Sequence, residues 1–460
     1  MEFRKKRKSP VKYILIFFIL AILGGSAYIY LSPAFEKNKP VVISKNSIYW
    51  NLKSKVNIKL QDESGIKYYK VTFKDAGKDI ILDQKVFTEV KKDLSLEISP
   101  PKLDMFYKGV DTKLEVEVVD NSKWNLLEGN KIVKTIDIKV DTKKPVANVL
   151  SNSRYIQRGG SAVIIVKVKD DNLKDAYISF NDKKRFELMP YYKDDYYVAL
   201  IAWPIDIENF SRVNLIAVDR ANNKTIAKVP FYLQKKIIKT DRINLSENFI
   251  RNISASVLEQ SFEAVPNNIK DIFLYSNKDL RAKNIETIEK TALQAMKNKK
   301  VDSFNIKAFK RLRGSKTVAG FAERRHYYLD GEKINEAWHL GIDWASVKKA
   351  PIRASNEGEV IFNSYLGLYG NSIIIDHGMG LASLYAHTSA QSVELGDTIN
   401  KNQKIANTGA TGAVFGDHLH FGILIQGVEA NPIEWMDRHW IKVRITDILE
   451  EAKKQIDGNL

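Results

Sequence analysis

The chain has 460 residues, with 72 Lys and Arg, 55 Asp and Glu and no cysteine, and its formal net charge is +17. The absence of cysteine excludes disulfides, thiolate metal ligands and Cys–His nucleophilic catalysis, and the length predicts several domains. The basic excess favours anionic partners such as phospholipid headgroups, while nucleic acid is not expected because the sequence has no recognisable nucleic-acid-binding motif.

The N-terminus has the pattern of a membrane anchor. Residues 1–12 carry six basic side chains and one acidic one, and residues 13–31 are nineteen uncharged, mostly apolar positions. As a helix these nineteen residues would span roughly 28 Å, close to the hydrocarbon thickness of a bilayer. The positive-inside rule places residues 1–12 in the cytoplasm as a basic tail and everything after Ser32 outside. We therefore expect a single-pass protein of the inner (cytoplasmic) membrane; removal as a signal peptide near residues 25–27 is the alternative.

Two stretches of similar length resemble copies of one all-β module, at residues 38–140 and 141–236. Their matching runs alternate apolar and polar residues and end at an aspartate, which is typical of half-buried strands. Such modules fit immunoglobulin-like β-sandwiches, which serve either as a spacer or as a surface for envelope protein partners. The matching runs are residues 56–62 and 164–170, and 114–120 and 213–219, and a Lys-Pro-Val stretch also recurs at 39–41 and 144–146.

Between residues 240 and 300 the apolar period becomes helical. Ser246 can cap a first helix that ends before Pro266, and Asn284 can cap a second helix that reaches Met296. This helical linker either restricts access to a neighbouring site, as a regulatory segment would, or only connects two domains.

The C-terminal domain, predicted at residues 301–440, alternates short strand-like runs with Gly and Asn turns, as an antiparallel sheet does, and a helix is expected within 441–460. His418 and His420 share one face of a strand, because strand side chains alternate with period two, and His339 and Asp343 share a face if their segment is extended. Two imidazoles and one carboxylate make a hydrolytic zinc ligand set with a position left for water. Only one histidine of the 418/420 pair need bind the metal.

The surrounding sequence resembles the lysostaphin-type (LytM-like, β-lytic) zinc metallopeptidases, which cleave peptide bonds in bacterial peptidoglycan. The resemblance implies that His339, Asp343 and His420 bind one Zn²⁺ per chain, and that His387 and His418 handle the attacking water and the developing oxyanion. None of the five positions departs from the family pattern. The resemblance covers roughly residues 305–440 and rests on three segments, 338–345, 384–387 and 409–422.

The resemblance implies a zinc-dependent endopeptidase that hydrolyses peptide cross-links of peptidoglycan outside the cytoplasmic membrane, with the stem peptides as substrate. The alternative is an envelope scaffold, or an activator of another cell-wall hydrolase, that uses the peptidase fold for binding. The bond cut and the oligomeric state do not follow from the sequence.

The other notable residues of this domain have ordinary explanations. His377 is expected to support the structure, and His326 and His439 to lie at the surface or in packing. Gly409, Gly412 and Gly416 are expected in turns, because no Lys-Ser/Thr follows them as in a phosphate loop. A further group either lines the substrate cleft or belongs to ordinary strands and turns: Tyr365, Tyr369 and Asn371.

Overall fold

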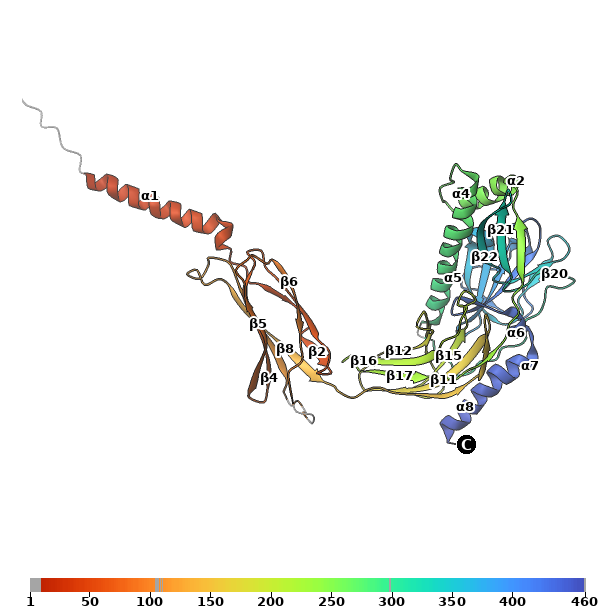
Figure 1. Ribbon diagram of the computed structural model, residues 1–460, viewed down its shortest axis with the longest axis horizontal. Helices are drawn as coiled ribbons and strands as arrows, with labels where there is room; N and C mark the ends of the chain where they lie inside the picture. The colour runs from red at the N-terminus through yellow and green to blue at the C-terminus, as the bar shows by residue number, and fades with distance from the viewer. Residues whose placement is uncertain (1–9, 104–106, 108, 110, 298, 459–460) are drawn as a thin grey trace, which may run out of the picture. The chain divides into compact units, whose positions relative to one another are not determined.

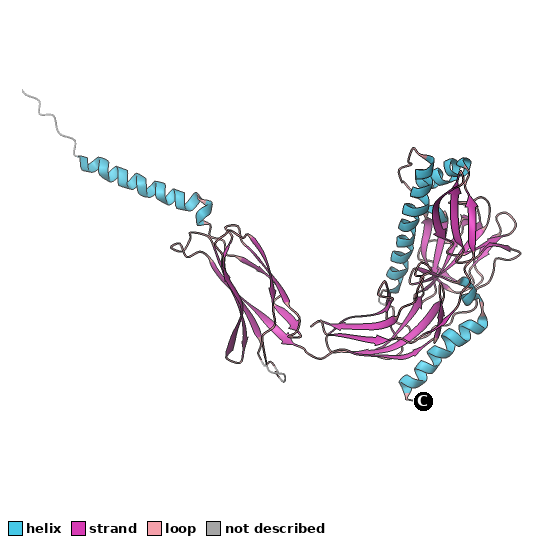
Figure 2. Cartoon of the chain, viewed as in Figure 1, coloured by secondary structure: helices cyan, strands magenta, loops and turns pink. Residues whose placement is uncertain are grey.

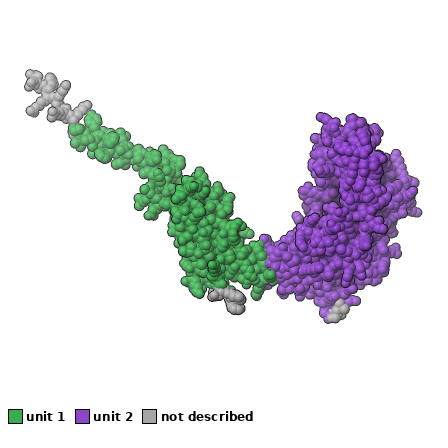
Figure 3. All heavy atoms as spheres, viewed as in Figure 1, with its two compact units in different colours: residues 1–144, 219–223 green, residues 145–218, 224–460 purple. Residues whose placement is uncertain are grey.

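The computed structural model describes residues 10–103, 107, 109, 111–297 and 299–458 (Figures 1 and 2). The described chain is mostly β with one apolar N-terminal helix, which confirms the predicted class. The basic tail predicted at residues 1–12 lies outside the described residues up to residue 9. The chain divides into two compact units, the first made of residues 1–144 and 219–223 and the second of residues 145–218 and 224–460 (Figure 3).

The first unit begins with the apolar helix α1 (Pro10–Leu31), whose 22 residues are all exposed. Its most apolar window has a mean hydropathy of 2.4. A helix of this length measures about 33 Å, enough to cross the hydrocarbon core of a bilayer. Length and composition therefore agree with the predicted anchor, and a signal sequence has the same properties.

Two antiparallel-rich sheets enclose the core of the first unit. One has the order β1 (Val41–Ile43), β3 (Val56–Gln61), β6 (Asp93–Ile98), and the other the order β2 (Ser47–Trp50), β8 (Lys131–Val140), β7 (Lys113–Asp120), β4 (Ile66–Asp75), β5 (Lys78–Val86). Every second side chain of β7 is buried, as expected for a strand with one face on a core. Trp50 packs edge-on against Phe73 inside, with ring centroids 6.2 Å apart.

The second unit contains the second strand-rich module. One sheet has the order β14 (Met189–Pro190), β15 (Tyr196–Ala202), β11 (Ser161–Lys169), β9 (Val146–Asn152), and the other the order β13 (Lys184–Glu187), β12 (Leu173–Phe180), β16 (Val213–Asp219), β17 (Lys224–Lys228). A parallel pair joins β10 (Tyr155–Gln157) to β18 (Tyr232–Gln234). Strand order differs between the two modules, and their immunoglobulin-like character stays a prediction.

The C-terminal domain is built on an antiparallel sheet, in the order β20 (Lys316–Ala319), β23 (Ile342–Ala345), β31 (Leu419–Ile425), β27 (Leu381–Ala386), β26 (Asn371–Asp376), β25 (Gly358–Tyr365), β29 (Thr398–Ile399), with β32 (Val428–Ala430) paired to β31. Two smaller sheets flank it, β24 (Pro351–Arg353), β30 (Lys404–Thr408), β28 (Thr388–Gln391) and β19 (Thr240–Asn244), β21 (Arg324–Leu329), β22 (Glu332–Trp338). All seven residues of β31 are buried, so this strand runs through the core.

The helical segment begins where the sequence predicts. Ser246 caps α2 (Glu247–Phe249), its Oγ accepting a hydrogen bond from the backbone N–H of Phe249, and the chain continues through η2 (Ile250–Ser254) and α3 (Ala255–Gln260). The prediction that Asn284 caps a separate helix is wrong. Asn268 caps α4 (Ile269–Leu274), which continues through η3 (Tyr275–Leu280) into α5 (Arg281–Met296), so Asn284 lies inside a helix.

Helices also end the chain, as α6 (Pro432–Met436), α7 (Arg438–Ile441), η5 (Lys442–Thr446) and α8 (Asp447–Asp457). They connect the C-terminal domain to the second strand-rich module, and the two share one hydrophobic core. Glu434 accepts a hydrogen bond from the backbone N–H of Ser161 (2.8 Å), and the Tyr191 hydroxyl donates to the carbonyl of Leu449 (3.0 Å).

Candidate active site

Three neighbouring strands bring the candidate residues to one end of the sheet. Asp343 on β23 and His420 on β31 are direct register partners, and His420 is in turn opposite Ala386, the last residue of β27. His387 follows β27 directly, and His418 precedes β31 by one residue. Strand pairing therefore gathers side chains that are up to 77 positions apart in the sequence.

The metal-ligating group predicted from the sequence is closely packed. Asp343 Oδ2 lies 3.0 Å from His339 Nε2, and Asp343 Oδ1 lies 2.8 Å from His420 Nδ1. The two imidazole nitrogens are 3.2 Å apart. Three donor atoms of the types that Zn²⁺ prefers thus lie within 4.8 Å of one another, close enough to hold a metal ion.

His339 is held from behind by the backbone. Its Nδ1–H donates to the carbonyl of Gly320 (2.7 Å), which leaves Nε2 as a lone-pair donor toward His420. The turn that carries Gly320 is fixed in its own right, because Glu323 Oε1 accepts from the Gly320 N–H (2.9 Å) and the Glu323 carbonyl accepts from the His339 N–H. The Nε2 lone pair of His339 thus lies beside His420 Nδ1 and the Asp343 carboxylate, an arrangement that fits a cation among the three.

The other ring nitrogen of His420, Nε2, is buried and has no hydrogen-bond partner in the described part of the chain. It faces the backbone of Gly341, where a Cβ atom would come within 2.5 Å of it. Glycine at position 341 therefore provides the space in which the His420 ring presents Nδ1 to the ligand group.

Burial would raise the pKa of the Asp343 carboxyl, but the adjacent His339 and His420 rings outweigh it and hold that pKa well below its usual range. Arg325 adds a positive charge, with its Nη2 3.7 Å from Asp343 Oδ2. The carboxylate is thus kept ionised, as a metal ligand must be.

His387 and His418 stand side by side next to this group, with ring centroids 4.9 Å apart. Each is oriented by a backbone carbonyl, His387 Nδ1 by Thr411 (2.8 Å) and His418 Nδ1 by Gly416 (2.8 Å). Burial, followed by the neighbouring His420 and His418, lowers the pKa of His387 to about 3. The backbone of His387 is left-handed, with φ of 59°, a strained conformation of the kind that is concentrated at functional sites.

The structure brings all five predicted site residues together and leaves the other histidines apart. His377 bonds to the Glu357 carbonyl and to Ser383 Oγ (2.6 and 2.7 Å), as a structural residue does. His326, on β21, has its Nε2 3.5 Å from Oε2 of Glu336 on β22. His439 is exposed on α7. Among the three cleft candidates, Tyr369 is buried with its ring edge-on to His420, with centroids 5.5 Å apart.

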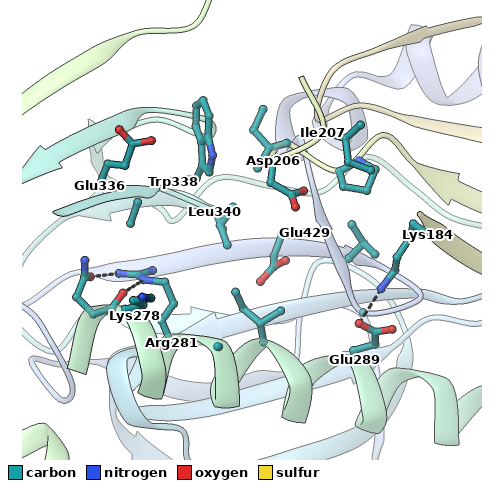
Figure 4. A pocket seen from close by; sticks show the side chains of 18 of the residues that line it. Lys184, Asp206, Ile207, Lys278, Arg281, Glu289, Glu336, Trp338, Leu340 and Glu429 are labelled. Atoms are coloured by element: carbon teal, nitrogen blue, oxygen red, sulfur yellow. Dashed lines mark hydrogen bonds and ion pairs between the residues drawn. The ribbon is translucent and has the colours of Figure 1, made fainter. Parts of the chain in front are cut away.

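A cavity of about 510 Å³ lies beside α5 (Figure 4). Tyr369 contacts both His420 and Glu429, and Glu429 lines this cavity. The Tyr369 hydroxyl donates to Glu429 (3.3 Å), and burial raises the pKa of Glu429 to about 7. Trp338 and Leu340, the residues on either side of His339, line the same cavity. Its walls carry charges of both signs, and Figure 4 shows Arg281, Lys184 and Glu289 among them, the last two joined by an ion pair of 2.6 Å.

The helical segment packs on two loops that border the site. Asn284 Oδ1 on α5 accepts from the Leu368 N–H (3.0 Å), and Phe249 on α2 stacks on Phe415 in the loop before His418. The five site side chains are largely enclosed, and His418 is accessible over 15% of its side-chain surface while Asp343 is accessible over 10%.

Sequence reasoning did not find the residues that hold the site from behind. Gly320, Glu323 and Thr411 act through backbone atoms or through one turn, and no spacing rule marks such contacts. Arg325 stands out only as one of two consecutive arginines.

Residues 337–432 match the model of Peptidase family M23, and this stretch contains all five site residues. Residues 337–432 form a Peptidase M23 domain. This agrees with the resemblance seen in the sequence. The M23 domain is the part of the C-terminal domain in which β23, β27 and β31 position the ligand group.

Curated relatives match the chain over this part. The DD-carboxypeptidase/endopeptidase Mpg of Neisseria meningitidis serogroup B is 40% identical over 113 residues, 25% of this chain and 25% of that protein. The peptidoglycan DD-endopeptidase ShyB of Vibrio cholerae serotype O1 is 32% identical over 109 residues, 24% of this chain and 25% of that protein. The chain thus spans about a quarter of the length of these relatives.

Among solved structures, the M23 domain is similar to the catalytic domain of the antimicrobial peptidase lysostaphin from Staphylococcus simulans. The two are 24% identical, the similarity covers 27% of this chain and 94% of that domain, and the TM-score is 0.23.

Proposed function

We propose that the chain is a zinc-dependent endopeptidase that hydrolyses peptide cross-links of bacterial peptidoglycan. The observation that carries the proposal is the convergence of His339 Nε2, Asp343 and His420 Nδ1 within an M23 domain, beside two further oriented histidines. Relatives named as peptidoglycan DD-endopeptidases support the same substrate class.

In this proposal His339, Asp343 and His420 hold one Zn²⁺. When bound, the ion polarises the scissile carbonyl and lowers the pKa of a water to about 7. Arg325, with its Nη2 3.7 Å from Asp343 Oδ2, stabilises the ionised form of the Asp343 carboxylate. The Gly320 carbonyl fixes the tautomer of His339 and so the direction of its Nε2 lone pair.

His387 and His418 move the protons of the reaction. The Nδ1–H of each donates to a carbonyl, so each presents Nε2 to the site. His387 stays neutral at physiological pH because burial lowers its pKa to about 3, and its Nε2 accepts a hydrogen bond from the attacking water. His418 is more exposed than His387. Its Nε2 gives a proton to the leaving amine, and the proton that the attacking water loses to the histidine pair replaces it.

We propose that α1 holds this enzyme in the inner (cytoplasmic) membrane as a single pass, with the basic tail in the cytoplasm and the M23 domain outside. The length and composition of α1 and the charge of residues 1–12 support this orientation. The stem peptides of the wall are then the anionic partner that the basic excess favours.

The test uses the full chain in detergent and residues 34–460, loaded with zinc and incubated with cross-linked peptidoglycan, with products read by mass spectrometry. We expect new uncross-linked muropeptides, absent for His418→Ala, which keeps zinc, and for His339→Ala, which binds zinc more weakly. Zinc bound one to one without any product would favour the alternative supported by the enclosed site, a scaffold or activator of another wall hydrolase.

A further inference from the structure

A turn in the first unit carries two leucines that point into solvent. It joins β7 to β8 and has the sequence Lys-Trp-Asn-Leu-Leu-Glu-Gly at 123–129. The side chain of Leu126 is 96% exposed and that of Leu127 is 65% exposed. A single exposed apolar side chain is ordinary, but two adjacent leucines at the tip of one turn form an apolar point that water solvates poorly. Such a point marks a surface that contacts something apolar.

The turn holds these leucines in a fixed and strained conformation. Three consecutive residues have left-handed backbones, Asn125, Leu126 and Leu127, with φ of 52°, 58° and 72°. Branched side chains such as leucine rarely adopt this region. Hydrogen bonds inside the turn maintain it, from the Leu127 N–H to the Lys123 carbonyl (3.2 Å) and from Asn125 Nδ2 to the Gly129 carbonyl (3.1 Å). Strain of this kind is concentrated where a segment has a function beyond the fold.

The same turn is joined to the end of α1. The Lys123 N–H donates to the carbonyl of Ala34 (2.7 Å), three residues after α1 ends, and three residues extend at most about 10 Å. Lys37 connects the two elements a second time. Its Nζ lies over the ring of Tyr30 in the last turn of α1 (4.8 Å) and over the ring of Trp124 (4.6 Å). The turn therefore lies at the level at which α1 ends.

This level coincides with the surface of a bilayer that α1 crosses. The 22 residues of α1 measure about 33 Å, and the hydrocarbon core of a bilayer is about 30 Å thick, with polar layers that bring the total to about 40–45 Å. The residues just after α1 thus pass through the polar layer on that side. Tryptophan and tyrosine are enriched in this layer, and here it would contain Tyr28, Tyr30 and Trp124.

We propose that Trp124, Leu126 and Leu127 insert into the interfacial layer of the bilayer that α1 crosses. The inference rests on the membrane anchor proposed above for α1. The apolar tip then meets the acyl boundary instead of water, and the strain of the turn is offset by this contact. The turn becomes a second attachment to the membrane beside the helix itself.

Two attachments determine how the first strand-rich module stands on the membrane. Asp120, just before the turn, pairs with Ile66 at the start of β4, and β4 runs from there to Asp75 at the opposite end of the module. Ten residues of strand measure about 33 Å. A module held by α1 alone could tilt freely about the helix end, whereas a module held also by the turn keeps the end near Asp75 away from the lipid.

The test uses the absence of cysteine in the chain. Leu126→Cys is labelled with an environment-sensitive fluorophore, and the full chain is placed in nanodiscs of phosphatidylethanolamine and phosphatidylglycerol that contain a headgroup spin-labelled lipid. The matched control is Lys78→Cys, exposed at the far end of the same module. We expect lipid quenching at position 126 to exceed that of the control by about threefold or more, because interfacial segments reach about 5–10 Å into the headgroup and acyl boundary.

Gel filtration of the same nanodiscs separates the two proposals. A chain that enters the nanodiscs but shows equal quenching at positions 126 and 78 overturns the contact of the turn and leaves the anchor in place. A chain that remains outside the nanodiscs overturns the anchor, and this inference falls with it.

A second variant excludes insertion by the fluorophore itself. With the label on Leu127→Cys, the additional change Leu126→Glu should reduce lipid quenching to the level of the Lys78→Cys control, because a charged side chain at the tip opposes entry into the acyl boundary. Both side chains lie outside the core, so the thermal unfolding of the module should not change. Undiminished quenching after Leu126→Glu would show that the label and not the turn enters the lipid, and would overturn the proposal.

Discussion

The ring of Phe249 stacks on the ring of Phe415, with centroids 4.4 Å apart and planes 28° apart. Phe249 belongs to the helical segment, and Phe415 lies three residues before His418. The contact therefore ties the helical segment to the loop that orients one of the two proposed proton-transfer residues. A second contact of the helical segment, between Asn284 and Leu368, lies on another loop that borders the site, and whether the segment restricts access or only connects can be tested by loosening these contacts.

We expect Phe249→Ala to raise the rate of peptidoglycan hydrolysis about three- to tenfold, because an aromatic pair contributes about 0.5–1.5 kcal/mol to the closed arrangement. Zinc content should not change. The matched control is Phe262→Ala in the same segment, whose side chain is 99% exposed and should leave the rate unaltered. Equal rates for Phe249→Ala and the unmodified enzyme would show that the segment only connects.

Gly341→Ala should abolish most activity with a small loss of folding stability. The added Cβ would lie 2.5 Å from His420 Nε2 and 2.6 Å from the carbonyl oxygen of Phe421, so the His420 ring must turn away from the ligand group. We expect zinc affinity to fall about 10- to 100-fold, measured by competition with a chelator. Gly416→Ala, close to His418 but with open space around it, is the control and should bind zinc normally. Normal zinc binding by Gly341→Ala would refute this account of residue 341.

Glu434 should make the second unit less stable as the pH rises. Burial raises its pKa to about 7, from 4.5 in an exposed state, although Ser161 and Gln157 donate hydrogen bonds to it. Its protonated form is favoured by folding, so its contribution is complete below pH 4.5 and is lost as the pH passes 7.

Urea unfolding at pH 5 and pH 8 tests this dependence. In Glu434→Gln the side chain at this position is uncharged at both pH values. From pH 5 to pH 8 the free energy of unfolding of this variant should fall by ~2–3 kcal/mol less than that of the unmodified chain. Glu429, whose pKa is raised in the same direction, leaves part of the slope in place. Identical slopes for the two proteins would mean that Glu434 is ionised in the folded state.

The helix α1 should stay on the mature protein. We expect the full-length mass in the membrane fraction after alkaline extraction, and release into the soluble fraction when Leu15 and Ile19 are both changed to Arg. Each charge at the middle of a span costs about 2.5–3.5 kcal/mol in insertion. The same two positions changed to Ala should remain in the membrane. A shortened chain would instead indicate cleavage as a signal peptide.

The sequence predicted the candidate site better than its surroundings. Strand periodicity paired His418 with His420, but β31 begins at Leu419, so His420 lies in the strand and His418 directly precedes it. The Gly320 carbonyl could not be predicted, because a backbone atom carries no residue signature. The contact between Glu434 and Ser161 joins residues 273 positions apart, and no local pattern in either segment predicts it.

The prediction for Asn284 was wrong because a tertiary contact between distant segments decides the role of its side chain. Asparagine is a favoured capping residue, so an Asn before an apolar period predicts the start of a helix. Here residues 269–280 are already helical, and the amide oxygen is used by the Leu368 N–H instead. Tertiary contact thus overrides a local preference, and a single sequence does not reveal where that happens.

The core shared by the second strand-rich module and the C-terminal domain has a consequence for containment. A protease that cut the chain between these parts would leave their apolar faces packed against each other, such as those around Tyr191 and Leu449, because the shared core joins them as well as the backbone. The M23 domain would therefore stay attached to the second strand-rich module after such a cut.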